Sequence, residues 1–206
     1  MCEAPPGSDL RLFHRGPDGE VLGGFADVEA ALPDGERLVF AANAGMYHRD
    51  RSPVGLYVEG GVETAPLVTR AGPGNFGMLP NGVFSVRTDG TFRVDETTAF
   101  DPDGVRHATQ SGPMLVIAGD LHPRFLRDSA SRKVRNGVGV RPDGTALFAK
   151  SEAPLNFHSF ARLFRDGLAA PDALYLDGTI SRLHIAGERS DGGLPMGPVA
   201  GVVARD

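Results

Sequence analysis

Most of the chain consists of short apolar runs separated by Gly, Pro, Asp and Asn, a pattern typical of strands joined by tight turns. Runs of this length predict strands rather than helices. The predicted strands are residues 37–42, 54–58, 114–117, 173–177, 183–186 and 199–204, and the predicted hairpins are residues 83–94 and 137–149. The hairpins turn at Asp89-Gly90 and Asp143-Gly144, where glycine supplies the positive φ of a tight turn. These segments predict a sheet with mainly antiparallel neighbours.

Two segments have helical periodicity. Residues 25–32 place apolar side chains on one face and stop at Pro33. A second helix is predicted after Asn156, its N-cap, with an apolar face made of Phe157, Phe160, Ala161, Phe164 and Leu168. The predicted fold class is therefore α+β, with a mainly antiparallel or mixed β-sheet and two or three surface helices.

Composition and charge mainly exclude certain partners and kinds of site. A chain of 206 residues with 41% hydrophobic content predicts a single domain over residues 1–206. The net charge of -5 offers no basic surface to nucleic acid, and no apolar run approaches the roughly 20 residues of a membrane span. Cys2 is the only cysteine, which excludes an internal disulfide and argues against a cysteine-based zinc site. The sequence does not indicate an oligomeric state.

The N-terminus has neither the basic start nor the apolar region of a signal peptide. Met1-Cys2 lacks the apolar residues that precede the cysteine of a bacterial lipobox, so lipidation is not expected. We expect instead that a leader or a first strand is missing before Cys2.

The aspartate at the end of one apolar run is the most informative residue. Most Asp-Gly pairs of the chain lie in polar surroundings and are predicted turns. Asp177-Gly178 instead closes the run Ala173-Leu174-Tyr175-Leu176, which predicts a carboxylate at the edge of a core. A carboxylate in that position needs a partner or a chemical task.

Three further segments place polar residues and glycine beside predicted strands. They are Asn43-Ala44-Gly45-Met46-Tyr47, Gln110-Ser111-Gly112-Pro113 and Ser131-Arg132-Lys133-Val134-Arg135-Asn136-Gly137. Each is also explained as an ordinary turn, and the basic segment as protection of a strand edge. Because all of them begin or end predicted strands, as Asp177 does, a sheet can gather them at one rim.

In this order, the segments resemble the phosphodiester glycosidase family. The motifs that carry the resemblance are Asn43-Ala44-Gly45-Met46-Tyr47, Gly74-Asn75-Phe76, Pro80-Asn81-Gly82-Val83-Phe84, Gln110-Ser111-Gly112-Pro113, Arg135-Asn136-Gly137-Val138-Gly139 and Tyr175-Leu176-Asp177-Gly178. The chain looks most like short, single-domain bacterial members of the family. Its animal member, the uncovering enzyme, removes N-acetylglucosamine from a phosphodiester cap on mannose 6-phosphate glycans. After the aspartate the family commonly has a glycine-rich run with a serine, where this chain has Thr179-Ile180-Ser181.

The resemblance implies a hydrolase that cleaves a sugar-1-phosphodiester, for example of N-acetylglucosamine, at the glycosidic bond, and it favours a periplasmic or secreted location. The leaving phosphomonoester makes a strong general acid less necessary than in ordinary glycoside hydrolysis. Asp177 is the predicted catalytic carboxylate, and Arg135 the predicted phosphate ligand, because a guanidinium binds two oxygens at once. The predicted substrate-binding residues are Asn43, Gly45, Ser111, Gly112, Asn136, Gly178 and Thr179.

Each assignment has a structural alternative. Arg135 could pair with a structural carboxylate, and Asp177 could accept the N–H groups of its own turn. Glu152 is a weaker candidate for a second carboxylate. Asp50 lies between two arginines and is predicted in a solvated loop. The histidines occur singly, without the spacing of a metal site, so neither a metal nor another cofactor is predicted.

Two other functions stay open. A glycan-binding domain without turnover usually presents aromatic platforms, whereas this chain has no Trp and only 3 Tyr. A phosphodiesterase that cleaves the P–O bond would also suit Arg135 and Asp177, but such enzymes commonly use metal ions.

Overall fold

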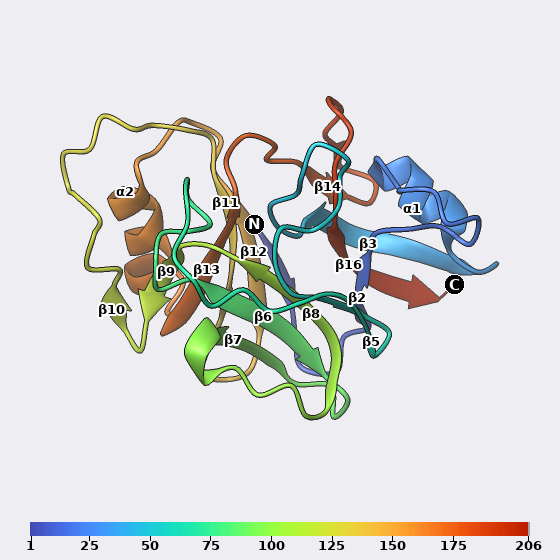
Figure 1. The fold of residues 1–206 in the computed structure, drawn as a ribbon. Helices are drawn as coiled ribbons and strands as arrows, with labels where there is room; N and C mark the ends of the chain where they lie inside the picture. The colour runs from blue at the N-terminus through green and yellow to red at the C-terminus, as the bar shows by residue number, and fades with distance from the viewer. Residues whose placement is uncertain (206) are drawn as a thin grey trace.

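The strands divide among three sheets, and every strand pair in them is antiparallel (Figure 1). The structure is a computed structural model that describes residues 1–205. The first sheet has the order β1-β12-β11-β13-β9-β10, the second β15-β14-β3-β16-β2 and the third β5-β4-β8-β6-β7.

The first sheet carries the strand that ends at Asp177. Its strands are β1 (Cys2–Ala4), β12 (Ala146–Lys150), β11 (Asn136–Val140), β13 (Asp172–Asp177), β9 (Met114–Ile117) and β10 (Asp120–Leu121). The helix α2 (Phe157–Arg162) continues as a π-helical turn, Leu163–Gly167, and packs Phe160 and Phe164 against Leu115 and Tyr175 of this sheet. Asn156 caps α2 as predicted, because its side chain accepts the Ser159 N–H at 2.9 Å.

The second sheet lies at the opposite end of the molecule from α2 (Figure 1). Its strands are β15 (Arg189–Ser190), β14 (Leu183–Ile185), β3 (Glu36–Asn43), β16 (Val199–Arg205) and β2 (Leu10–Phe13). The helix α1 (Phe25–Ala31) buries Phe25 and Val28 against Leu38 and Val203. The predicted amphipathic face of residues 25–32 is therefore the face that covers this sheet.

The third sheet contains a strand that is buried along its whole length. The sheet consists of β5 (Val62–Ala65), β4 (Tyr57–Glu59), β8 (Val105–Ser111), β6 (Gly82–Arg87) and β7 (Phe92–Glu96), and a 3-10 helix, Thr97–Ala99, follows β7. Every residue of β6 is buried. A strand buried on both faces has to be covered by other parts of the chain.

One apolar core joins the three sheets. Phe40 of β3, Phe84 of β6 and Phe148 of β12 each come from a different sheet. The Phe148 ring lies 5.7 Å from the Phe40 ring and 5.5 Å from the Phe84 ring, between ring centroids. Aromatic side chains bury a large apolar area and so contribute strongly to the core. This shared core fixes how the ends of the three sheets approach one another.

The α+β class, the two helices and the two hairpins are confirmed. The predicted antiparallel strands are divided among three sheets. The strand predicted over residues 54–58 begins only at Tyr57, since Val54 donates its N–H to Met46 in the preceding loop at 3.1 Å. No helix among the described residues combines the length and apolar character of a membrane span.

Candidate active site

Asp177 ends β13 with one carboxylate oxygen held by the backbone. Oδ1 accepts the N–H of Gly178 at 2.5 Å and that of Thr179 at 2.8 Å. The residue is only 8% exposed. Burial raises the pKa of Asp177, although the N–H groups of Thr179, Gly178 and Ile180 act in the opposite direction. The second oxygen, Oδ2, has no hydrogen-bond partner within residues 1–205.

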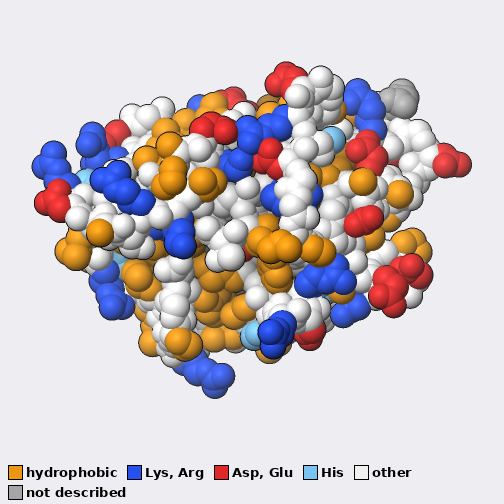
Figure 2. Space-filling view, turned by 90° about the horizontal axis from the view of Figure 1, so that it is seen from above, with side chains coloured by type: hydrophobic (Ala, Val, Ile, Leu, Met, Phe, Trp, Pro, Cys, Tyr) orange, Lys and Arg blue, Asp and Glu red, His pale blue; other side chains and the backbone are white. Residues whose placement is uncertain are grey.

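A cavity of about 620 Å³ opens at this carboxylate. Its lining is mostly apolar, and Asp177 is the one carboxylate among the described residues that line it. The other residues come from loops far apart in the sequence, among them Tyr47, Phe76, Thr179, Ile180, Leu194 and Pro195. In Figure 1 the loop after β13 lies at the top of the molecule, and Figure 2 shows that upper face, where hydrophobic side chains gather near the middle. A carboxylate in apolar surroundings, facing a cavity, is typical of a functional site.

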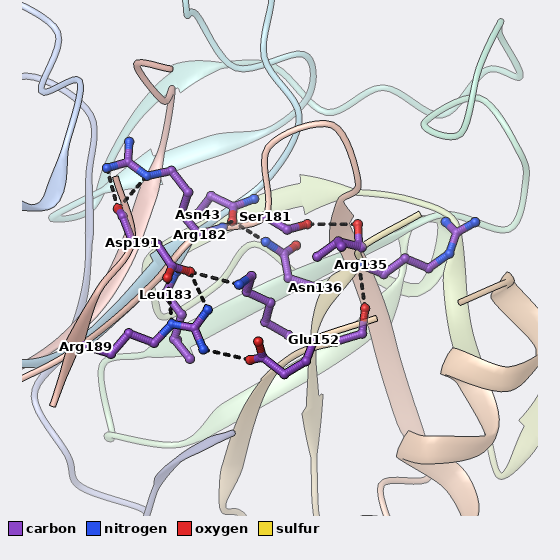
Figure 3. A network of polar contacts seen from close by, with 12 residues as sticks. Asn43, Arg135, Asn136, Glu152, Ser181, Arg182, Leu183, Arg189 and Asp191 are labelled. Carbon is purple, nitrogen blue, oxygen red and sulfur yellow. Dashed lines mark hydrogen bonds and ion pairs between the residues drawn. The ribbon is translucent and has the colours of Figure 1, made fainter. Parts of the chain in front are cut away.

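Hydrogen bonds that involve residues of all three sheets surround the end of β13. Asn136 of β11 accepts the Asp177 N–H through Oδ1 at 2.8 Å, and its Nδ2 donates to Oδ1 of Asn43 at the end of β3 (Figure 3). Ser111, at the end of β8, donates its hydroxyl to the Leu176 carbonyl at 2.9 Å. The three sheets therefore meet at the last two residues of β13.

The structure thus brings the predicted polar residues together, but inside the protein. Asn43, Ser111 and Asn136 are each at most 2% exposed, and their hydrogen bonds go to protein groups. Nδ2 of Asn43 is buried without a hydrogen-bond partner within residues 1–205. This geometry makes the three side chains positioning residues for Asp177, and their direct contact with a substrate stays a prediction.

The glycine after Asp177 is required by a close contact. Gly178 does not have a positive φ, whereas Gly90 and Gly144 of the two hairpin turns do, at 83° and 84°. A Cβ at Gly178 would instead lie 1.8 Å from the hydroxyl oxygen of Tyr175. Tyr175 is fully buried, and burial raises the pKa of its hydroxyl, although the nearby Arg135 guanidinium acts in the opposite direction. Glycine is therefore needed here because a side chain approaches the backbone closely.

The other predicted glycines lie beside the site rather than in the lining of its cavity. Gly45 follows β3 with a φ of 153°, and a Cβ there would lie 3.0 Å from the Thr109 hydroxyl. Gly112 forms a cis peptide with Pro113, and a Cβ there would lie 2.6 Å from the Cβ of Asn81. Both glycines allow chain segments to pack closely behind Asp177, and their backbone contact with a substrate stays a prediction.

Arg135 lies apart from the cavity. Its guanidinium donates from Nε to Leu155 O at 2.7 Å and from Nη2 to Ser131 O at 3.0 Å, and it stacks 3.7 Å from the centre of the Phe157 ring. The side chain points away from Asn43 and Asn136 (Figure 3). No carboxylate within residues 1–205 forms an ion pair with it, and burial lowers its pKa, although the nearby Tyr175 hydroxyl acts in the opposite direction. The predicted phosphate contact stays a prediction.

The weaker candidates have structural partners elsewhere. Glu152 accepts a hydrogen bond from Arg189 at 2.7 Å in a surface ion-pair network (Figure 3). Asp50 accepts from the backbone and the hydroxyl of Ser52 at 3.0 and 2.6 Å, in the exposed loop predicted for it. No group of three or more His, Cys, Asp or Glu within the described part of the chain could hold a metal ion.

The sequence reasoning gave no role to several residues that line the cavity. Tyr47 is the most prominent: its hydroxyl donates to Pro195 O at 3.1 Å, and burial, together with the nearby charge of Asp177, raises its pKa. Tyr47 and Phe76 belong to motifs that carried the family resemblance, which was the one available signal. Leu194 and Pro195 lie in a loop without a recognisable motif, so sequence alone could not place them here.

Comparison with known proteins identifies the family of this chain. The sequence matches the phosphodiester glycosidase family over residues 36–195. It is 36% identical over 186 residues to the uncharacterised protein YigE of Escherichia coli K12, covering 89% of this chain and 72% of YigE.

Solved structures share the fold at low sequence identity. The catalytic domain of zebrafish N-acetylglucosamine-1-phosphodiester alpha-N-acetylglucosaminidase, auto-inhibited by its pro-peptide, has a TM-score of 0.66 at 14% identity, covering 94% of this chain and 72% of that chain. A protein from Burkholderia pseudomallei has a TM-score of 0.68 at 13% identity, covering 97% and 72% of the two chains. From the sequence match over most of its length, with the shared fold in support, this chain belongs to the phosphodiester glycosidase family.

Proposed function

We propose that this protein hydrolyses a sugar-1-phosphodiester, such as one of N-acetylglucosamine, at the glycosidic C–O bond, with Asp177 as the central carboxylate. The observation that carries the proposal is the buried carboxylate of Asp177, which lines a mostly apolar cavity while its Oδ1 accepts two backbone N–H groups. The family and the name of the zebrafish neighbour support this choice of substrate.

The proposed reaction needs few groups. The oxygen of a water molecule bonds to C1 of the sugar, and the bond between C1 and the bridging phosphate oxygen breaks. The electron pair of that bond stays on the oxygen and leaves with the phosphomonoester. Ionised Asp177 stabilises the oxocarbenium-like sugar or accepts the proton of the attacking water, and both roles need the charged form. The two backbone N–H groups keep the carboxylate in one orientation, which favours attack from a fixed direction.

The first test of the proposal combines a substitution with an isotope. Asp177→Asn preserves the shape of the side chain, and its Oδ1 can still accept both N–H groups. We expect turnover of a methyl ester of N-acetylglucosamine 1-phosphate to fall by on the order of 10²–10⁴, the usual contribution of a catalytic acid or base.

Hydrolysis in ¹⁸O-labelled water identifies the bond that breaks. The proposal requires ¹⁸O in the released sugar, whereas ¹⁸O in the phosphate would indicate a phosphodiesterase that cleaves the P–O bond. A folded wild-type protein that turns over no member of a panel of sugar-1-phosphodiesters, but binds them, would indicate a glycan-binding domain.

We also propose that Arg135 contacts the substrate phosphate. The support is a buried guanidinium without a carboxylate partner within residues 1–205. Contact requires the segment at Ser131 to open, because the Ser131 carbonyl now accepts from Nη2.

Arg135→Ala should then lower kcat/KM for phosphodiesters by roughly 10–100-fold more than for a neutral aryl glycoside of the same sugar, as expected for a lost charge-assisted hydrogen bond. Arg132→Ala, an exposed arginine of the same segment, is the matched control. Equal losses on both substrates would make Arg135 a structural residue.

A further inference from the structure

The loop between β10 and β11, residues 122–135, concentrates positive charge in a protein whose net charge is -5. Its exposed charged residues are the cations Arg124, Arg127, Arg132 and Lys133 and one carboxylate, Asp128. No carboxylate within residues 1–205 forms an ion pair with any of the four cations. In Figure 1 the loop passes beside α2, and Figure 2 shows several Lys and Arg side chains at that end of the molecule. The negative net charge therefore hides a local surface that attracts anions.

Contacts with the start of α2 hold this loop in place. The Phe125 ring stacks on the Phe157 ring, with 4.9 Å between the ring centroids. Asn156, the N-cap of α2, donates from Nδ2 to Arg127 O at 2.9 Å and to Ser129 O at 3.3 Å. The cations therefore project from a backbone with a defined shape, which reduces the entropy lost when a partner binds several of them at once.

One apolar side chain lies among the cations without being buried. Leu126 is 71% exposed and stands directly before Arg127. Cations around an exposed apolar side chain are typical of a surface that binds an anionic membrane, because the cations are attracted to the headgroups while the apolar side chain enters the interface. A single-stranded nucleic acid fits this surface less well, because its bases need exposed aromatic rings, and Phe125 and Phe157 already stack on each other.

We propose that the loop of residues 122–135 docks the protein on a membrane surface that contains anionic phospholipid, with its four cations at the headgroups and Leu126 in the interface. This inference does not depend on the proposed reaction, because none of these residues lines the cavity at Asp177. It assigns the protein a surface on which it works, in addition to the site at which it acts.

Sedimentation with lipid vesicles tests the inference without a substrate. In about 0.05 M salt, we expect vesicles of phosphatidylcholine with about 30% phosphatidylglycerol to bind the protein at least about 10-fold more tightly than vesicles of phosphatidylcholine alone. Arg124→Gln/Arg127→Gln should weaken binding to the anionic vesicles by roughly 10–30-fold, because each cation near such a surface contributes about fivefold. Leu126→Ser should weaken it by roughly 3–10-fold. Arg70→Gln/Arg93→Gln, which removes two exposed arginines outside the loop, is the matched control and should bind like the wild type.

Equal binding to the two kinds of vesicle, or binding to neither, would overturn the inference. Equal losses in the loop variant and in its control would also overturn it, because binding would then follow net charge and not the loop. Tighter binding of polyphosphate or of a single-stranded oligonucleotide than of the anionic vesicles, unchanged in Leu126→Ser, would indicate a soluble anionic polymer as the partner instead. Turnover of a soluble diester should be the same in Arg124→Gln/Arg127→Gln as in the wild type, so a failure of docking is distinguished from a failure of the proposed reaction.

Discussion

At the scale of a single residue, Asp177 meets two opposing demands. The proposed chemistry needs its carboxylate ionised, but its burial at the end of β13 favours the neutral form. The N–H groups of Gly178 and Thr179 offset part of this cost by binding Oδ1. A residue kept charged at a cost in stability is expected where function requires the charge.

This conflict predicts that Asp177→Asn is more stable than the wild type at pH 7. The pKa of Asp177 is raised in the folded protein, so its contribution to stability is fully present below the unfolded value of about 3.9 and is lost as the pH rises through the folded value. The asparagine variant does not ionise and escapes this loss. Urea unfolding should show a higher free energy of unfolding for the variant at pH 7, and the difference should disappear near pH 3. A variant less stable at pH 7 would contradict the prediction.

Gly178 is a second residue whose requirement is specific. A methyl group there meets the Tyr175 hydroxyl oxygen at 1.8 Å, and without that oxygen the nearest atom is the Tyr175 Cζ at 3.1 Å. We expect Gly178→Ala to cost about 1–3 kcal/mol, as other overpacked sites do. Tyr175→Phe removes this hydroxyl together with its interaction with the Arg135 guanidinium and should cost about 1 kcal/mol.

The double variant Gly178→Ala/Tyr175→Phe should recover most of the loss, which a double-mutant cycle on thermal or urea unfolding measures. Additive effects would show that the hydroxyl is not the obstacle. Gly192→Ala is the control glycine, because a Cβ there meets no atom within 4 Å and its φ is not in the left-handed region.

At the scale of elements, strong local signals in the sequence were sufficient to predict turns and helix ends. The glycines of the hairpin turns at Asp89-Gly90 and Asp143-Gly144 do have positive φ, and Asn156 does cap α2. The sequence did not predict β1, β2, β5 and β8, and length alone does not explain this, because β8 has seven residues. β1 and β2 pair with β12 and β16, which lie far along the chain, whereas β5 forms a hairpin with the neighbouring strand β4.

The residues of the candidate site were also predictable only where the signal was local. Asp177 could be found because a carboxylate closing an apolar run is a local feature of the sequence. The burial of Arg135 could not, because it results from contacts with Leu155 and Phe157, about 20 residues further along the chain.

At the scale of the whole molecule, three sheets meet at one point, and this arrangement depends on contacts between them. The strand order does not follow from local patterns, since β11 and β13 pair across α2 and β3 pairs with β16 at the far end of the chain. Apolar contacts supply part of the junction, through Phe148 of β12. A polar contact supplies another part: Asp191 accepts from Lys150 of β12 at 2.9 Å and from Arg189 of β15 at 2.6 Å, and so joins the first sheet to the second (Figure 3).

The contribution of Asp191 to stability should depend on pH in the opposite direction to that of Asp177. Burial acts to raise the pKa of Asp191, but hydrogen bonds from Arg189, Lys150 and the Leu183 N–H outweigh it and lower the pKa. The stabilisation by Asp191 is therefore present above the unfolded value of about 3.9 and is lost as the pH falls through the folded value. Asp191→Asn should lower the free energy of unfolding at pH 7 by about 1–2 kcal/mol, a range reduced for partial exposure.

Urea unfolding between pH 7 and pH 2 tests this, and the gap between wild type and variant should close at the acidic end. Asp166→Asn removes an exposed partner of Arg162 and Arg165 within one helical segment and should leave the free energy of unfolding nearly unchanged. If Asp191→Asn behaved like this control, the ion pairs would be a surface feature, and the apolar contacts of Phe148 would hold the first two sheets together without them. If it behaved as expected, a carboxylate outside the cavity would help to keep the ends of β3 and β13 in register, and with them Asn43, Asn136 and Asp177.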